Sequence, residues 1–174
     1  QFFGEAWSLA VEEWFYLLLP LTLWLARGRP AARTIVLLSI VLLVVSLGGR
    51  GARYLTASHF DFDDMYRRTV IFRLDTFCWG MLMYLAARRW NAVVRHWRFA
   101  LFGCGSALMY LSALATMHPV YGEAFMAIGL LTTASMGSAL LIPFFCSISI
   151  TGAAERAVYF LSTRTYALYL THGL

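Results

Sequence analysis

The sequence predicts an all-α, polytopic integral membrane protein with about six transmembrane helices in one bundle. The chain of 174 residues is 60% apolar and only 13% charged, whereas soluble domains carry about 25% charged residues. Its mean hydropathy is +0.67. The apolar residues form runs close to the ~20 residues that cross a ~30 Å hydrocarbon core. No internal repeat or shift in composition is present, so we expect residues 1–174 to form a single membrane domain.

The first two expected helices differ in character. Residues 7–26 begin with aromatic and polar side chains and contain Pro20, which we expect to kink the helix. Residues 34–48 are almost entirely Ile, Leu and Val, which favours a short peripheral helix facing lipid.

The third expected helix, residues 70–87, carries charges in its first turns. Arg73 and Asp75 are two residues apart and cannot face each other on one helix surface, so each needs a different partner. A guanidinium suits a carboxylate or an anionic ligand group, which makes Glu12 one candidate partner for Arg73; an arginine that extends to the membrane interface is the alternative. Gly80 leaves room for another backbone to approach closely.

The remaining expected helices cover residues 99–117, 125–148 and 162–174. Arginines cluster in the first and third connections, while the connection at residues 118–124 has neither Lys nor Arg. The positive-inside bias therefore places the first and third connections in the cytoplasm and predicts a multi-pass protein of the inner (plasma) membrane. The second connection, expected at residues 49–69, contains four arginines and three aspartates, and alternation places it outside.

Other classes of protein are excluded by the same composition. The net charge of +5 comes from arginines that flank apolar runs, and no basic face of a soluble fold is present, so we expect no nucleic-acid binding. Cys78, Cys104 and Cys146 lie in apolar runs without a CxxC pair, and the four histidines show no ligand spacing. No metal site is predicted.

Two adjacent carboxylates, Glu12 and Glu13, lie inside the first expected helix. A carboxylate at the centre of a spanning helix costs about 2.5–3.5 kcal/mol, so we expect both to face protein, a cavity or a counter-charge. Helical spacing puts Glu12 on one face with Ser8 and Tyr16, and Glu13 about 100° around the helix. The alternative is a structural pair, with one carboxylate neutralised by Arg73 and the other protonated.

A second polar stripe lies in the last expected helix, where Ser162, Thr165, Tyr169 and His172 share a face. His172 either forms a hydrogen bond to a neighbouring helix or takes part in chemistry, and the spacing leaves both interpretations open.

Three segments resemble the motifs of one family. Residues 7–16 read W-S-L-A-V-E-E-W-F-Y, similar to the W-S-L-x-x-E-E-Q-F-Y signature of acyltransferase family 3. Residues 73–80 resemble its R-x-x-x-F-x-x-G helix, and residues 165–172 resemble its closing S-Y-x-L-Y-L-x-H segment. One departure is Trp14, where the family usually has Gln.

The resemblance implies a bacterial membrane O-acyltransferase that moves an acyl group, usually acetyl, from acyl-CoA to a hydroxyl of a cell-surface carbohydrate or lipid-linked acceptor. It implies a domain of about ten helices, with a catalytic His and a basic residue upstream of Gln1. We therefore expect this chain to be the C-terminal portion, to require those helices, and to be inactive alone. The catalytic candidates are Glu12, Glu13, Arg73, Asp75 and His172. Glu12 would orient the upstream His, and Arg73 would hold an anionic or carbonyl group.

Two other interpretations stay open at this point. A transporter or lipid flippase would use the same intramembrane charges as a substrate or proton pathway, although no inverted repeat is present. A structural or partner-binding membrane segment would fit the second expected helix. It would not explain the polar residues of the first, third and last expected helices.

Overall fold

The computed structural model of the protein describes residues 6–117 and 122–171, which form helices joined by short connections, with no β-strand among them. The long helices are α1 (Ala6–Leu25), α2 (Ala31–Thr56), α3 (Asp75–Arg89), α5 (Arg98–Met117), α7 (Leu130–Phe145) and α8 (Ala153–Thr171). The short elements are η1 (Asp63–Arg67), η2 (Val70–Arg73), α4 (Asn91–His96), α6 (Gly122–Ala124) and η4 (Phe125–Gly129). The all-helical prediction is confirmed for the described residues.

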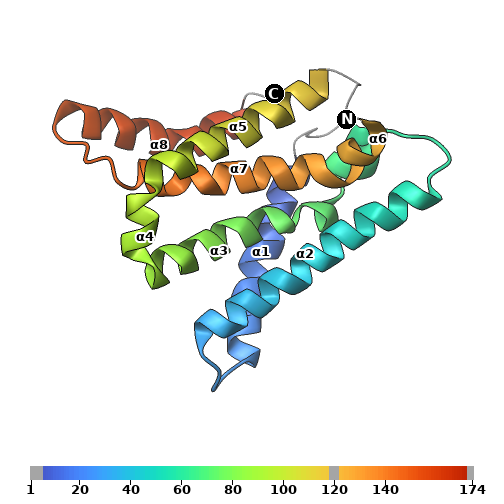
Figure 1. Ribbon diagram of the computed structural model, residues 1–174, viewed down its shortest axis with the longest axis horizontal. Coiled ribbons are helices and arrows are strands. Elements are labelled where there is room, and N and C mark those ends of the chain that lie inside the picture. Colours follow the sequence, from blue (N-terminus) through green and yellow to red (C-terminus); the bar gives the residue numbers. More distant parts are fainter. Residues whose placement is uncertain (1–5, 118–121, 172–174) are drawn as a thin grey trace.

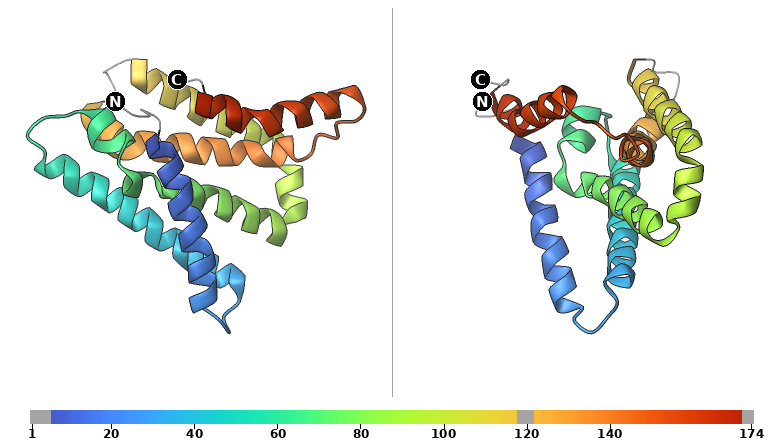
Figure 2. Two further views of the ribbon diagram at one scale, coloured as in Figure 1. Left: turned by 180° about the vertical axis from the view of Figure 1, so that it is seen from behind. Right: turned by 90° about the vertical axis from the view of Figure 1, so that its left-hand side faces the viewer.

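Four helices lie side by side in the order α2, α3, α7, α5 (Figure 1). The α5 and α7 helices share the most extensive contact, followed by α2 with α3 and α3 with α7. The α1 helix packs against α2 and η2. Figure 2 shows that α8 returns along the edge of the bundle and that its C-terminal end lies close to the N-terminal end of α1. The described side chains of α8, residues 153–165, are exposed.

Four helical segments of the described chain are long and apolar enough to cross a membrane: Ala31–Thr56, Val70–Arg89, Arg98–Met117 and Phe125–Phe145. They correspond to the second to fifth expected helices. The expected number of about six is not confirmed, because α1 and α8 are helical but do not belong to this set. Membrane crossing by those two helices stays a prediction.

The end of the second helix was predicted wrongly at residue 48, since α2 continues to Thr56. Consecutive glycines usually mark a helix end, and Gly48-Gly49 gave that signal here. The helix continues because Arg50 is buried and is hydrogen-bonded to neighbouring helices. Gly49 also leaves room for the Phe72 ring, whose Cε1 atom would lie 2.7 Å from a Cβ at that position.

The start of the last helix was also predicted wrongly, because α8 begins at Ala153 and not near residue 162. Gly152, with a φ of 72°, adopts the left-handed conformation immediately before the helix. The first turns of α8 contain Glu155 and Arg156, so no apolar run marks the start of this helix in the sequence.

Close backbone approach occurs at α5 and α7 and not at Gly80. A Cβ at Gly80 would have no neighbour within 4 Å, so no backbone of the described residues uses the room that Gly80 leaves. A Cβ at Gly105 would lie 2.8 Å from the Gly137 carbonyl oxygen, and a Cβ at Gly137 would lie 3.0 Å from the Gly105 carbonyl oxygen. A hydrogen bond of 3.0 Å joins Ser112 to Thr133 along the same contact. Small residues thus allow these two helices to pack closely.

The two arginine clusters lie at the same end of the bundle. Arg33, at the start of α2, lines one cavity together with Arg88 and Arg89, at the end of α3. At the other end, Arg53 and His59 line a separate cavity. The alternation of connections predicted from the sequence therefore agrees with the packing of the described helices.

Candidate functional site

A buried ion pair lies where α2, α3 and α7 meet. Both partners, Arg50 and Asp75, have side chains that are 0% exposed, and Arg50 Nη2 donates to Asp75 Oδ2. Arg50 Nη1 donates to the Ile128 carbonyl oxygen at 2.9 Å and to Thr132 Oγ1 at 3.1 Å. Thr132 Oγ1 in turn donates to Asp75 Oδ2 at 2.7 Å. One polar network therefore joins three helices inside the bundle.

The Asp75 carboxylate is held by only one of its two oxygen atoms. Oδ2 accepts from Arg50 and Thr132, whereas Oδ1 is buried and accepts no hydrogen bond from the described residues. The guanidinium balances the carboxylate charge, which makes an ionised carboxylate tolerable at this depth. The arrangement fixes the orientation of Asp75 through one oxygen atom and leaves the hydrogen-bonding capacity of Oδ1 unused by the described residues.

Neighbouring hydroxyl groups support this network. Ser46 Oγ donates to the Ile71 carbonyl oxygen at 2.8 Å, and Arg50 Nε donates to the Ser46 carbonyl oxygen at 3.3 Å. Ser135 Oγ on α7 donates to Thr76 Oγ1 on α3 at 3.1 Å. These bonds hold η2 and the first turn of α3 against α2 and α7.

The sequence identified Asp75 but missed Arg50. The sequence did contain a signal for Arg50. The acid Asp75 in the apolar third helix needs a basic partner, and Arg50 precedes that helix in the chain. Three glycines, Gly48, Gly49 and Gly51, surround Arg50 and are typical of a connection, so the sequence predicts Arg50 outside the helices.

The α1 helix places both glutamates on the surface. Val11 is buried, and the Phe15 ring stacks on Phe77 of α3 with ring centroids 4.1 Å apart, so this face of α1 packs on the bundle. Glu12 and Glu13 are exposed, and Tyr16 is 68% exposed. Within the described part of the chain, no helix covers the two carboxylates, and the expectation that they face a cavity or a counter-charge stays a prediction.

Arg73 and His172 are the remaining catalytic candidates predicted from the sequence. Arg73 lies half-buried in η2, the element against which α1 packs. His172 lies outside the described residues, so its prediction is not examined by the structure.

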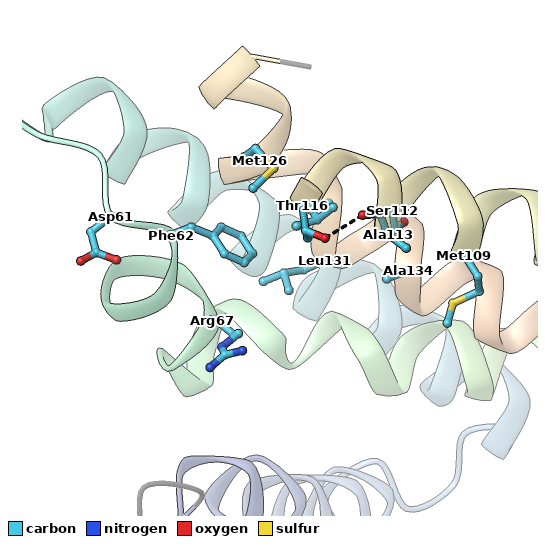
Figure 3. Close-up of a pocket in the computed structure, with 11 residues that line it drawn as sticks. Asp61, Phe62, Arg67, Met109, Ser112, Ala113, Thr116, Met126, Leu131 and Ala134 are labelled. Carbon is cyan, nitrogen blue, oxygen red and sulfur yellow. Dashed lines mark hydrogen bonds between the residues drawn. The ribbon is translucent and has the colours of Figure 1, made fainter. Parts of the chain in front are cut away.

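A cavity of about 600 Å³ lies at the end of the bundle opposite the arginine clusters (Figure 3). Asp61 and Arg67 lie on the connection that forms one of its sides, and Met109 and Leu131 contribute apolar surface from α5 and α7. Thr116 Oγ1 donates to the Ala113 carbonyl oxygen at 2.7 Å, the bond drawn in Figure 3. The cavity combines a charged end with apolar walls, which suits an amphipathic molecule.

Tyr66 anchors the connection beside this cavity. Its side chain is fully buried among aromatic rings, with centroid distances of 5.8 Å to Phe60, 6.4 Å to Phe62 and 6.1 Å to Phe72. Burial raises the pKa of Tyr66 above its ordinary value of 10.0, an effect that nearby Arg53 partly opposes. The hydroxyl therefore stays protonated at neutral pH.

No group of three His, Cys, Asp or Glu side chains that could hold a metal ion occurs in residues 6–117 and 122–171. In comparisons with known proteins, no family model, no curated protein and no solved structure matches this chain.

Proposed function

We propose that the protein takes part in membrane O-acyl transfer, from acyl-CoA, with acetyl as the favoured acyl group, to a hydroxyl of a cell-surface carbohydrate or a lipid-linked acceptor. The proposal rests on the resemblance of three segments to acyltransferase family 3. The observation that carries it is the contact between two of those segments. Phe15 of the first stacks on Phe77 of the second at 4.1 Å, and α1 packs against η2.

The reaction would form an ester and break a thioester. The acceptor oxygen attacks the thioester carbonyl carbon, a base takes the hydroxyl proton, and CoA leaves as a thiolate that is then protonated. A site between membrane helices excludes water as a competing nucleophile and strengthens the local electrostatics.

The described residues suggest a division of roles. Asp75, fixed by Arg50 and Thr132, would accept a hydrogen bond at Oδ1 and so position a reacting group. Arg73 would hold an anionic or carbonyl group, and His172 would support the site. We retain Glu12 as the carboxylate that orients a catalytic base, with Glu13 beside it.

The exposure of Glu12 and Glu13 supports the proposal that a further helical segment covers this face of α1. Two uncovered carboxylates would each cost about 2.5–3.5 kcal/mol within a bilayer. A covering segment that carries a basic group would remove this cost and complete the site.

The predicted topology supports transfer from acyl-CoA on the cytoplasmic side to an acceptor on the opposite side of the membrane. With the arginine clusters in the cytoplasm, acyl-CoA would approach the protein from the cytoplasmic end of the bundle. The acceptor would approach the opposite end, where the amphipathic cavity of Figure 3 lies.

The direct test is mass analysis of surface carbohydrate from cells with and without the encoding gene. We expect acyl esters to be lost on deletion and restored by the wild-type gene but not by Asp75→Asn at equal membrane abundance. Unchanged esters in the deletion strain would overturn the proposal. Loss of the carbohydrate itself, with esters intact on the remainder, would favour the transporter or flippase alternative.

A further inference from the structure

The cavity at the arginine end is separate from the site described above. It has a volume of about 830 Å³ and lies between the first turns of α2 and the last turns of α3. Arg33, Arg88 and Arg89 contribute charge, and residues such as Ile35 and Leu82 contribute apolar surface. This volume lies within the range of about 300–1,000 Å³ that is typical of ligand sites.

The charge at this end is not balanced by nearby carboxylates. The sequence contains no Asp or Glu at residues 14–60 or 76–122. On α8, Glu155 is followed by Arg156 and adds no net charge. The clustered arginines are Arg27, Arg29, Arg33, Arg88, Arg89, Arg95 and Arg98.

Exposed aromatic side chains lie near the cavity, a pattern that is typical of the depth of lipid headgroups. Trp24, Tyr84 and Trp90 are exposed at the ends of α1 and α3. Arg27 lies 4.8 Å from the centroid of the Trp24 ring, and Arg88 Nη1 donates to the Tyr84 hydroxyl at 3.2 Å. Trp and Tyr are enriched at the membrane interface, because their rings are apolar and their polar atoms remain hydrated.

We propose that this cavity binds an anionic phospholipid. Its phosphate lies among Arg33, Arg88 and Arg89, and one acyl chain lies along the apolar surface between α2 and α3. Basic pockets between transmembrane helices on the cytoplasmic side bind lipid headgroups of this kind. CoA is the other source of phosphate esters, but its ribose and pantetheine need several polar partners. Apart from the three arginines, the side chains of the lining offer Tyr84 and Trp90 as polar partners, and the rest are apolar. The inference does not depend on the proposed acyl transfer.

The test measures lipid binding to the purified chain in detergent by native mass spectrometry, with added phosphatidylglycerol or phosphatidylcholine. We expect tight binding of phosphatidylglycerol and not of phosphatidylcholine. The triple variant R33Q/R88Q/R89Q should weaken phosphatidylglycerol binding on the order of a hundredfold, from about fivefold for each arginine. The control R27Q/R95Q/R98Q removes the same charge from the same end but changes no residue of the cavity, and it should weaken binding less than about tenfold.

Two results would overturn the inference. Equal losses in the two triple variants would mean diffuse attraction by the positive end and no lipid site. Free CoA could instead displace the bound lipid, and its binding could be weakened by the same triple variant. That result would show that the cavity binds CoA and not a phospholipid. If R33Q/R88Q/R89Q does not fold, Leu82→Trp tests the cavity with all arginines present. It should lower phosphatidylglycerol binding at least tenfold, and unchanged binding would contradict the proposal.

Discussion

At the residue scale, the network around Arg50 and Asp75 determines how the third helix is held. Removing two charges from water costs several kcal/mol for each ion, and only good geometry with additional hydrogen bonds compensates for this. Arg50 has such bonds to Ile128 and Thr132, and Thr132 also donates to Asp75. The pair therefore specifies which faces of α2, α3 and α7 meet.

Breaking the pair from one side should destabilise the fold strongly. Arg50→Met leaves the Asp75 carboxylate buried without its cation, and we expect a loss of about 3–5 kcal/mol in the free energy of unfolding. Arg50→Met/Asp75→Leu should lose less than the sum of the single variants, because the double variant leaves no uncompensated charge. Reversible unfolding in mixed micelles would measure both, and additive losses would show that the two residues act independently.

The two glutamates of α1 are expected to differ in function. Under the proposed acyl transfer, Glu12→Gln keeps the volume and removes the charge, and loss of a carboxylate that orients a base should slow acylation on the order of 10²–10⁴-fold. Glu13→Gln should cost less, since Glu13 lies outside the face shared by Glu12 and Tyr16. Acylation rates at matched membrane abundance would measure this.

Glu155→Gln, an exposed carboxylate on α8, is the matched control and should leave the rate unchanged. A near-normal acylation rate for Glu12→Gln would contradict this role and would favour the structural interpretation of both glutamates.

Individual site residues were predictable from the sequence where a charge interrupted an apolar run. Asp75 was found in this way, and the structure shows it buried and paired. Its partner could not be predicted, because 25 residues separate it from Arg50 and only the packing of α2 on α3 brings them together.

At the element scale, the sequence predicted helix ends well where charged residues flank the helix, and poorly where glycine lies near the end. The expected helix at residues 99–117 differs by one residue at its start from α5, which begins at Arg98. The ends of α2 and α8 differ more, because tertiary contacts in α2 and polar first turns in α8 override the local signals. Glycine content alone also failed to distinguish Gly80 from Gly105, since only Gly105 contacts another backbone.

Close packing of α5 on α7 should depend on Gly105. Gly105→Val would place a Cβ 2.8 Å from the Gly137 carbonyl oxygen, which is backbone and cannot move aside. We expect a loss of about 1–3 kcal/mol in the free energy of unfolding, the usual cost of overpacking. Gly103→Val makes the same chemical change on the same helix, where a Cβ would meet no atom of the described residues within 4 Å.

Gly103→Val should therefore be close to neutral when both variants are unfolded under the same conditions. Equal losses at the two positions would mean that the effect comes from helix propensity and not from the contact with α7.

At the scale of the whole molecule, the helices arrange the chain into two chemically different ends. One end carries the arginine clusters and the basic cavity between α2 and α3. The other carries the aromatic connection around Tyr66 and the amphipathic cavity of Figure 3. Composition and arginine spacing predicted this polarity, whereas the order α2, α3, α7, α5 depends on long-range contacts that no local pattern contains.

The central claim is that these two ends lie on opposite sides of a membrane, because both the proposed direction of acyl transfer and the proposed lipid site depend on it. Single cysteines at Ser58 and Asn91 test this directly, in a background in which Cys78, Cys104 and Cys146 are replaced. Both positions are exposed, Ser58 after α2 and Asn91 after α3. In intact cells, an impermeant maleimide should label the cysteine at position 58 and should label that at position 91 only after the membrane is opened. Equal labelling of both positions in intact cells would contradict the account.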